Sequence, residues 1–306
     1  MLVFASSDKG GTGRSVTSCN LAYQLALSSF DVCYVDFDFG SPTAGAIFGA
    51  EDFSVGTLSG AGTHAVMQGD ADNIELCELL AVSENLALRS RPPGIGRLAL
   101  APGDAGRGEF GRKAGDVERC VNLFARLEEE FDYSLIDLSA GRSYATAIVL
   151  EALRSDRLER VRSRWLIFHR WTQQHIIAAS GLVYGGRGIL ELAGGLGYDT
   201  EELLDELRFV RTAVVDPNSP DLAGLRPAQL AWFVERNHAL ADLAAKLDVG
   251  RSMMLGEVPL DPVLQWREQL ITDRDVHDSG VANQVTMDAF RDLAAALGLE
   301  SAWQRI

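Results

Sequence analysis

The sequence is poor in the features that mark secreted, metal-binding or membrane-spanning proteins. Its 306 residues include only four cysteines with no CxxC pair, and five histidines with no HxH or HExxH spacing. Neither a disulfide framework nor a zinc site is indicated. No apolar run approaches the roughly 18 residues that span a bilayer, and no signal-like segment opens the chain. We therefore expect a cytoplasmic protein with reduced cysteines.

Positive charge is also scarce, with 28 basic against 43 acidic side chains and a net charge of −15. DNA and anionic membranes attract a cationic face, so direct nucleic acid binding is disfavoured. The arginine-rich stretch at 155–164 is interrupted by Asp156 and Glu159, which makes it a weak nucleic-acid candidate. An apolar stripe near the C-terminus carries Asp288 and Asp292 on its polar face, where membrane anchors prefer Lys and Arg. Stable membrane binding is thus also disfavoured.

Short apolar runs of β-type residues alternate with helical patterns along the chain. Such alternation predicts an α/β fold, a doubly wound and mostly parallel sheet flanked by helices, in a single domain over 1–306. The irregular stretches near 51–97 and 185–202 are predicted to be insertions or loops on that domain. The strands are expected at residues 2–6, 32–38, 98–102, 133–139, 165–169, 209–215 and 252–259.

A glycine-rich loop follows the first predicted strand directly. Residues 9–15 read KGGTGRS, and an amphipathic helix is predicted from Val16. Glycines let the backbone turn tightly and direct its N–H groups to phosphate oxygens, and the start of a helix adds positive charge. The hydroxyl of Ser15 is a candidate Mg²⁺ ligand. The predicted phosphate-binding residues are Gly10, Gly11, Thr12, Gly13, Arg14, Ser15 and Val16.

The loop resembles the deviant KGGxGK[ST] loop of the ParA/MinD family of P-loop NTPases (SIMIBI class), with Arg14 in place of the usual lysine. The resemblance spans nearly the whole chain. It implies a Mg²⁺-dependent ATPase that binds ATP and ADP and forms a homodimer with nucleotide at the interface. It also implies that Lys9 reaches the partner's nucleotide, and that Lys9 and Arg14 belong to the catalytic residues.

Three aspartates follow the loop in the order that this family shows. The segment VDFDFG resembles the family's DxD segment, and LIDLSAG at 135–141 resembles a Walker B strand end. Because side chains alternate along a strand, Asp36 and Asp38 point the same way. The resemblance implies that Asp36 and Asp137 support Mg²⁺ and that Asp38 orients the attacking water. The simpler alternative is that Asp36 and Asp38 cap a turn.

Two later segments bear on recognition of the base. LGEVPLD at 255–261 resembles the family's LGxIPxD segment, which implies that Pro259 and Asp261 border the base. The strand FVRTAVVD stands where the family shows an asparagine that recognises adenine, and either Arg211 or Thr212 takes that place here. The resemblance therefore implies phosphate binding more directly than adenine recognition.

Arg14 leaves two functional hypotheses open. Arginine keeps the charge of lysine but is larger, planar and forked, so phosphate binding can persist while the geometry for hydrolysis is degraded. The first hypothesis is a slow ATPase that positions or regulates a protein partner as an ATP-bound homodimer. The second is a pseudo-ATPase that retains the fold as a scaffold or regulatory binding module. Nothing in the sequence identifies the partner.

A Rossmann-type dinucleotide site is the third possibility. Gly11 and Gly13 followed by Asp36 fit part of its fingerprint, but Val16 stands where Gly or Ala is needed. A dinucleotide site would also leave Lys9, Ser15 and Asp137 without a role.

Overall fold

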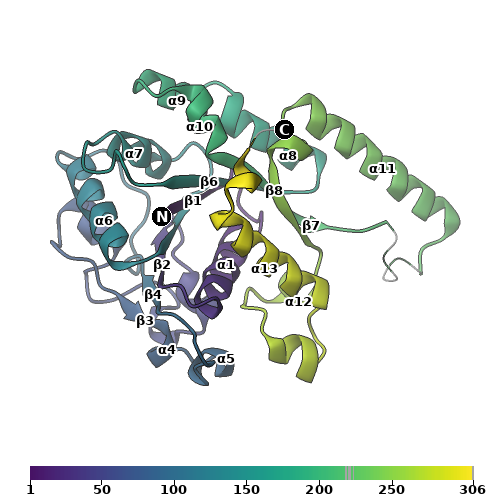
Figure 1. The fold of residues 1–306 in the computed structure, drawn as a ribbon, viewed down its shortest axis with the longest axis horizontal. Helices are drawn as coiled ribbons and strands as arrows, with labels where there is room; N and C mark the ends of the chain where they lie inside the picture. Colours follow the sequence, from purple (N-terminus) through teal and green to yellow (C-terminus); the bar gives the residue numbers. More distant parts are fainter. Residues whose placement is uncertain (218, 220–221, 223, 305–306) are drawn as a thin grey trace.

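The computed structural model describes residues 1–217, 219, 222 and 224–304. Its centre is one eight-stranded sheet with helices on both faces (Figure 1). The strands are β1 (Leu2–Ser6), β2 (Val32–Phe37), β3 (Cys77–Glu78), β4 (Leu98–Ala101), β5 (Tyr133–Leu138), β6 (Ser163–Arg170), β7 (Leu207–Val214) and β8 (Met254–Pro259).

The helices fill the connections between these strands. They are α1 (Arg14–Leu27), α2 (Ala44–Phe48), α3 (Thr63–Gln68), α4 (Leu79–Val82), α5 (Leu86–Arg89), α6 (Asp116–Glu130), α7 (Tyr144–Leu153), α8 (Gln173–Tyr184), α9 (Ile189–Gly195), α10 (Thr200–Asp205), α11 (Pro227–Lys246), α12 (Pro262–Trp266) and α13 (Gln284–Gly298). Short 3₁₀ segments cover Glu51–Phe53, Arg251–Met253 and Glu300–Trp303, and a π-helical turn covers Arg274–Asp278.

The strand order is β3-β4-β2-β5-β1-β6-β7-β8. Only β3 runs antiparallel to its neighbour among the pairs of described strands. Because β2, β5 and β1 are parallel neighbours, their carboxyl ends meet at one edge of the sheet. Ala5 of β1 lies beside Asp137 of β5, which lies beside Asp36 of β2. In an open α/β sheet this edge is where ligands bind.

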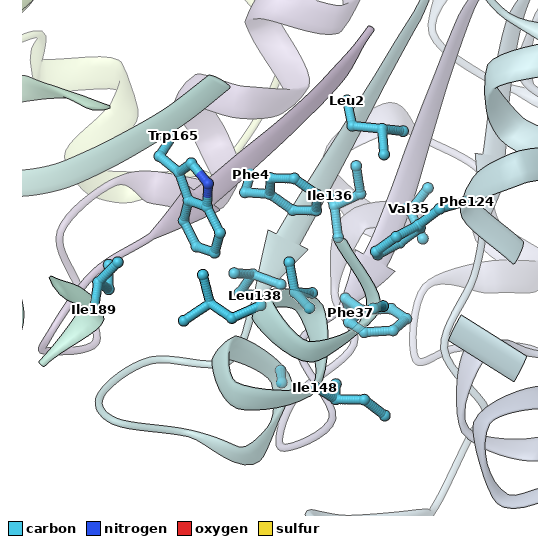
Figure 2. Packing of buried hydrophobic residues seen from close by; sticks show 14 of the residues in the cluster. Leu2, Phe4, Val35, Phe37, Phe124, Ile136, Leu138, Ile148, Trp165 and Ile189 are labelled. Carbon is cyan, nitrogen blue, oxygen red and sulfur yellow. The ribbon is translucent and has the colours of Figure 1, made fainter. Parts of the chain in front are cut away.

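The central strands are buried on both faces, which is why they read as nearly continuous apolar runs. One cluster packs against α6, α7 and α8, and Figure 2 shows Phe4, Phe37, Ile136 and Trp165 at its centre. The rings of Phe4 and Trp165 lie with centroids 4.8 Å apart. The second cluster fills the opposite face beneath α1 and α13. The carboxyl edge of β1, β2 and β5 therefore belongs to a sheet whose two faces are both packed against helices.

The predicted doubly wound, mostly parallel sheet is confirmed, and each of the seven expected strands is present within a few residues of its expected bounds. The eighth strand, β3, was not predicted. It has two residues, too few for a periodic pattern, and it lies in the stretch 51–97 together with several short helices. The stretch 185–202 contains α9 and the start of α10.

One apolar stretch, Gln173–Gly195, is long and hydrophobic enough to cross a membrane by composition alone, with a mean hydropathy of 1.3. The sequence pattern alone predicted no membrane-spanning segment. In the fold this stretch is divided into α8 and α9 by a turn at 185–188, and α8 packs on β6. Its apolar residues supply part of the first core cluster, which accounts for their hydrophobicity.

Candidate functional site

The loop at residues 9–15 leaves the end of β1 and turns directly into α1, whose first residue is Arg14 rather than the expected Val16. Gly11 and Gly13 have φ of +70° and +76°, a left-handed conformation that a side chain would strain. Gly13 precedes the first helical turn and offers no side-chain cap. The first backbone N–H groups of α1 have no intrahelical acceptor and carry the positive end of the helix dipole. The loop thus has the geometry of an anion site.

Arg14 points away from this loop surface and into the protein. Its side chain is 6% exposed. Its Nε donates to Oδ1 of Asp137, one Nη donates to Oδ2 of Asp38 at 2.8 Å, and the other lies 3.3 Å from the hydroxyl of Ser7. Burial acts to lower the pKa of Arg14, but the carboxylates of Asp137 and Asp38 outweigh it and raise this pKa. The guanidinium is therefore a fixed positive charge between two strand ends.

The three predicted aspartates do come together. Asp36 and Asp137 are register partners on β2 and β5, and both are nearly inaccessible to solvent. Burial, and then the charge of Asp137, raise the pKa of Asp36 well above its usual range. The carboxylate of Asp36 accepts backbone N–H groups of Ala44 at 3.3 Å and Asp38 at 3.4 Å. Both contacts cap turns of the backbone. The alternative that Asp36 caps a turn therefore describes part of its role.

Two contributors to this cluster were not foreseen in the sequence. The hydroxyl of Tyr34 donates to Oδ2 of Asp137 at 2.7 Å, and Tyr34 is fully buried. Ser7 supplies the third contact of Arg14. Tyr34 lies two residues before Asp36 on an alternating strand, so a signal for their shared face was present. No sequence signal linked Tyr34 to its hydrogen-bond partner Asp137 on β5, which lies 103 residues away.

A cavity of about 230 Å³ opens beside the loop. Its wall includes Thr12 of the loop and Val16 of α1, together with Thr212 of β7 and Pro259 of β8. The Thr212 hydroxyl donates to the carbonyl oxygen of Thr12, which ties β7 to the loop. The cavity therefore joins the predicted phosphate loop to the predicted base-binding segment. Its further lining residues are Gly11, Gly13, Thr17, Arg170, Ala213, Val258, Asp261, Leu264, Gln265 and Glu268.

Asp261 lines this cavity, but its carboxylate is engaged elsewhere. One oxygen accepts the N–H of Val263 at 3.1 Å and caps α12. The other accepts from the backbone of Asn283 and the hydroxyl of Thr286, both at 2.8 Å. Asp261 thus holds α12 and α13 against the end of β8.

Arg211, a sequence candidate for contact with the base, does not line this cavity. Arg211 and Thr212 are consecutive on β7 and face opposite sides of the sheet, and Thr212 faces the loop. The Arg211 guanidinium lies 3.8 Å above the ring of Trp171 and 3.8 Å from the Glu257 carboxylate. It lines a separate cavity of about 990 Å³. Of the two candidates for the adenine position, Thr212 lines the cavity beside the loop and Arg211 does not.

Lys9 and Ser15 occupy different environments at the loop. Lys9 is exposed, and its carbonyl oxygen accepts the Ser7 hydroxyl at 3.0 Å. Ser15 is half-buried in the first turn of α1. Within the described part of the chain, no group of three or more His, Cys, Asp or Glu side chains is arranged to hold a metal ion. Ser15 therefore remains a predicted ligand only.

The sequence pattern of the CobQ/CobB/MinD/ParA nucleotide binding domain matches residues 3–225. The chain is 30% identical over 144 residues to the septum site-determining protein MinD of Helicobacter pylori (strain ATCC 700392 / 26695), which covers 46% of this chain and 45% of that protein. The chain spans about half the length of the curated relatives it matches.

Solved structures resemble the fold over nearly its whole length. The MinC:MinD cell division complex of Aquifex aeolicus aligns with a TM-score of 0.60 at 16% identity, covering 97% of this chain and 94% of that one. The septum site-determining protein MinD of Pyrococcus horikoshii OT3, complexed with Mg-ADP, aligns with a TM-score of 0.53 at 16% identity and covers 100% and 99% of the two chains. At such identities the likeness establishes the fold.

Proposed function

Because the chain belongs to the CobQ/CobB/MinD/ParA nucleotide-binding family, and similar MinD and ParA structures are those of ATPases, we propose that it binds ATP and ADP at its loop. We propose further that it acts as a nucleotide-dependent homodimer on a protein partner. One observation carries the proposal. The left-handed glycines Gly11 and Gly13 turn the backbone into the N-terminus of α1, directly beside a cavity.

The phosphates would lie against the loop and the first turn of α1. There the backbone N–H groups and the helix dipole favour an anion, and Gly13 keeps the backbone free of a side chain. The base would lie between Val16 and Pro259, which line the cavity on its loop and β8 sides. Thr212 offers a hydroxyl at this wall where the resemblance implies an asparagine.

The dimer would form across the face that carries the loop. Lys9 is exposed there, and a second copy facing this surface would receive its ammonium group close to the bound phosphates. An extended, flexible lysine is suited to a contact between subunits because its charge lies at the end of a long side chain.

The partner would be a protein that acts in the cytoplasm. A net charge of −15 opposes the counterion release that drives binding to DNA and the attraction to anionic lipid. In the Aquifex aeolicus structure, MinD is in complex with another protein, MinC. This net charge is more compatible with a protein partner than with DNA or an anionic membrane.

A second candidate function is a nucleotide-binding scaffold without turnover, and Arg14 is the observation that favours it. A residue that orients water needs a free carboxylate oxygen near the reacting phosphate. In this chain Oδ2 of Asp38 accepts from Arg14 at 2.8 Å and Oδ1 accepts from the backbone of Gly40 at 3.1 Å. Arg14 and Gly40 therefore compete with an attacking water for the acceptor sites of Asp38.

Phosphate release separates the two functions. Turnover by the wild-type chain that Asp38→Ala abolishes would establish the ATPase, and Arg14→Lys is expected to raise the rate by freeing Asp38. Wild-type release no faster than that of Asp38→Ala would leave only the scaffold. Mass in solution, measured with ATP and with ADP for wild type and Lys9→Ala, tests the dimer. If ATP leaves the mass of the wild type unchanged, nucleotide-dependent dimerisation is refuted.

A further inference from the structure

Each carboxylate oxygen of Asp38 and Asp137 accepts a hydrogen bond from the protein itself. Asp137 accepts from Arg14 through Oδ1 and from Tyr34 through Oδ2 at 2.7 Å. Asp38 accepts from Arg14 through Oδ2 at 2.8 Å and from the backbone of Gly40 through Oδ1 at 3.1 Å. One guanidinium thus bridges the two side chains that the family resemblance assigns to Mg²⁺ support and to water activation.

Asp36 completes the pattern. Its Oδ1 accepts from the backbone of Asp38 at 3.4 Å, and its Oδ2 accepts from the backbone of Ala44 at 3.3 Å. Every carboxylate oxygen of the three aspartates therefore has a protein donor.

Such a donor set does not fit Mg²⁺. This ion demands near-octahedral oxygen coordination and in nucleotide sites is held through one or two carboxylates together with water and phosphate. Here the carboxylates of Asp38 and Asp137 already face a cation within hydrogen-bonding distance, and Arg14 remains charged at any physiological pH. A divalent cation at these carboxylates would have to compete with the guanidinium for their oxygens.

Arg14 acts on the carboxylates rather than on the phosphate itself. Its side chain is 6% exposed and does not line the cavity beside the loop. By contacting Asp137 and Asp38, the guanidinium lowers the negative charge that a nucleotide phosphate would meet at the ends of β5 and β2.

On the premise that nucleotide binds at this loop, we propose that the guanidinium of Arg14 takes over the charge-neutralising role of Mg²⁺, so that this chain binds nucleotide independently of divalent cations. The predicted metal set of Ser15, Asp36 and Asp137 is then a vestige of the family pattern in which the metal role has passed to an arginine.

The test is a calorimetric titration of the full chain with ADP and with the non-hydrolysable analogue AMPPNP, in excess Mg²⁺ and in excess EDTA. For the wild type we expect dissociation constants that agree within about threefold between the two conditions, equivalent to less than about 0.7 kcal/mol. For Arg14→Lys, whose compact ammonium cannot bridge both carboxylates, we expect Mg²⁺ to tighten binding about tenfold or more.

The outcomes separate this inference from the proposed function. Binding of the wild type that weakens about tenfold in EDTA would overturn the role of Arg14 but leave nucleotide binding intact. Binding by Arg14→Lys that stays independent of Mg²⁺ would equally overturn the assignment to Arg14. Absence of binding in both conditions would refute the proposed function itself.

A second measurement on the wild type does not depend on the folding of any variant. Ligand that binds only the native state raises the unfolding midpoint. The rise produced by ADP should be the same in Mg²⁺ and in EDTA, after subtraction of each condition without nucleotide. A rise seen only with Mg²⁺ would overturn the inference.

Discussion

Replacing Arg14 by methionine should destabilise the protein more than any other single loss of charge described above. Methionine keeps a comparable side-chain length but removes the guanidinium that contacts Asp137 and Asp38. Arg14 is 6% exposed and Asp137 2% exposed, so the aspartate would be left as a buried charge beside Asp36. Breaking one side of a buried ion pair costs about 3–5 kcal/mol, and we expect that loss for Arg14→Met.

A surface pair provides the matched control. Arg97 donates to Glu78 at 2.6 Å, but these side chains are 34% and 48% exposed. Solvent screens such a pair, so Arg97→Met should cost no more than about 1 kcal/mol. Both variants would be compared with the wild type by urea unfolding at neutral pH, with the slope against denaturant checked for constancy.

The double variant with Asp137→Asn completes the measurement. Once the arginine is gone, removing the buried negative charge should recover part of the lost stability. The double variant should therefore be more stable than Arg14→Met alone, with a coupling energy of about 2 kcal/mol. An Arg14→Met variant as stable as Arg97→Met, or a double variant that recovers nothing, would refute the assignment of a buried, charge-compensating pair.

Three further predictions concern the loop, the aspartate cluster and pH. Gly13→Ala should lower the unfolding free energy by about 1–2 kcal/mol because φ is +76° at this position. The control Gly10→Ala, whose added methyl meets nothing within 4 Å, should change it by less than about 0.5 kcal/mol. Equal losses in the two variants would contradict backbone strain at Gly13. Tyr34→Phe should lower the unfolding free energy by about 1.5–3 kcal/mol through the lost bond to Asp137, and an unchanged urea midpoint would show that this bond contributes nothing. Burial lowers the pKa of His169 from 6.5 to about 4, so its stabilising contribution, present above pH 6.5, should be lost as the pH falls toward 4, about 3 kcal/mol in all. His169→Phe should reduce the difference in unfolding free energy between neutral and acidic pH by that amount, and an identical pH dependence in both proteins would exclude it.

The fold and the phosphate loop could be predicted from the sequence because their signals are local. A strand, a glycine loop and a helix are adjacent in the chain, and alternation along β2 puts Asp36 and Asp38 on one side. The order of the loop and the aspartates along the chain then led to the family. The strand β3 could not be predicted because its two residues are too few to show an alternating pattern.

The alternation of side chains along a strand explains why the sequence left both Arg211 and Thr212 as candidates. Arg211 and Thr212 are neighbours, so a shift of one residue exchanges the face on which each side chain lies. Only the register of β7 against β6, together with the bond from Thr212 to Thr12, assigns Thr212 to the loop side. Arg211 is then left to stack on Trp171 in a different cavity.

Patterns local to the chain are enough to predict a doubly wound α/β domain with a glycine loop suited to phosphate, and to show that arginine stands where the related loops have lysine. Where Arg14 points was decided only by the tertiary structure. Its partners Asp38 and Asp137 lie 24 and 123 residues away and meet because β2, β5 and β1 are neighbours in one parallel sheet. A long side chain at the start of a helix turns toward whichever charges the fold brings within reach. Here the buried carboxylate of Asp137 and the half-buried carboxylate of Asp38 draw the guanidinium inward.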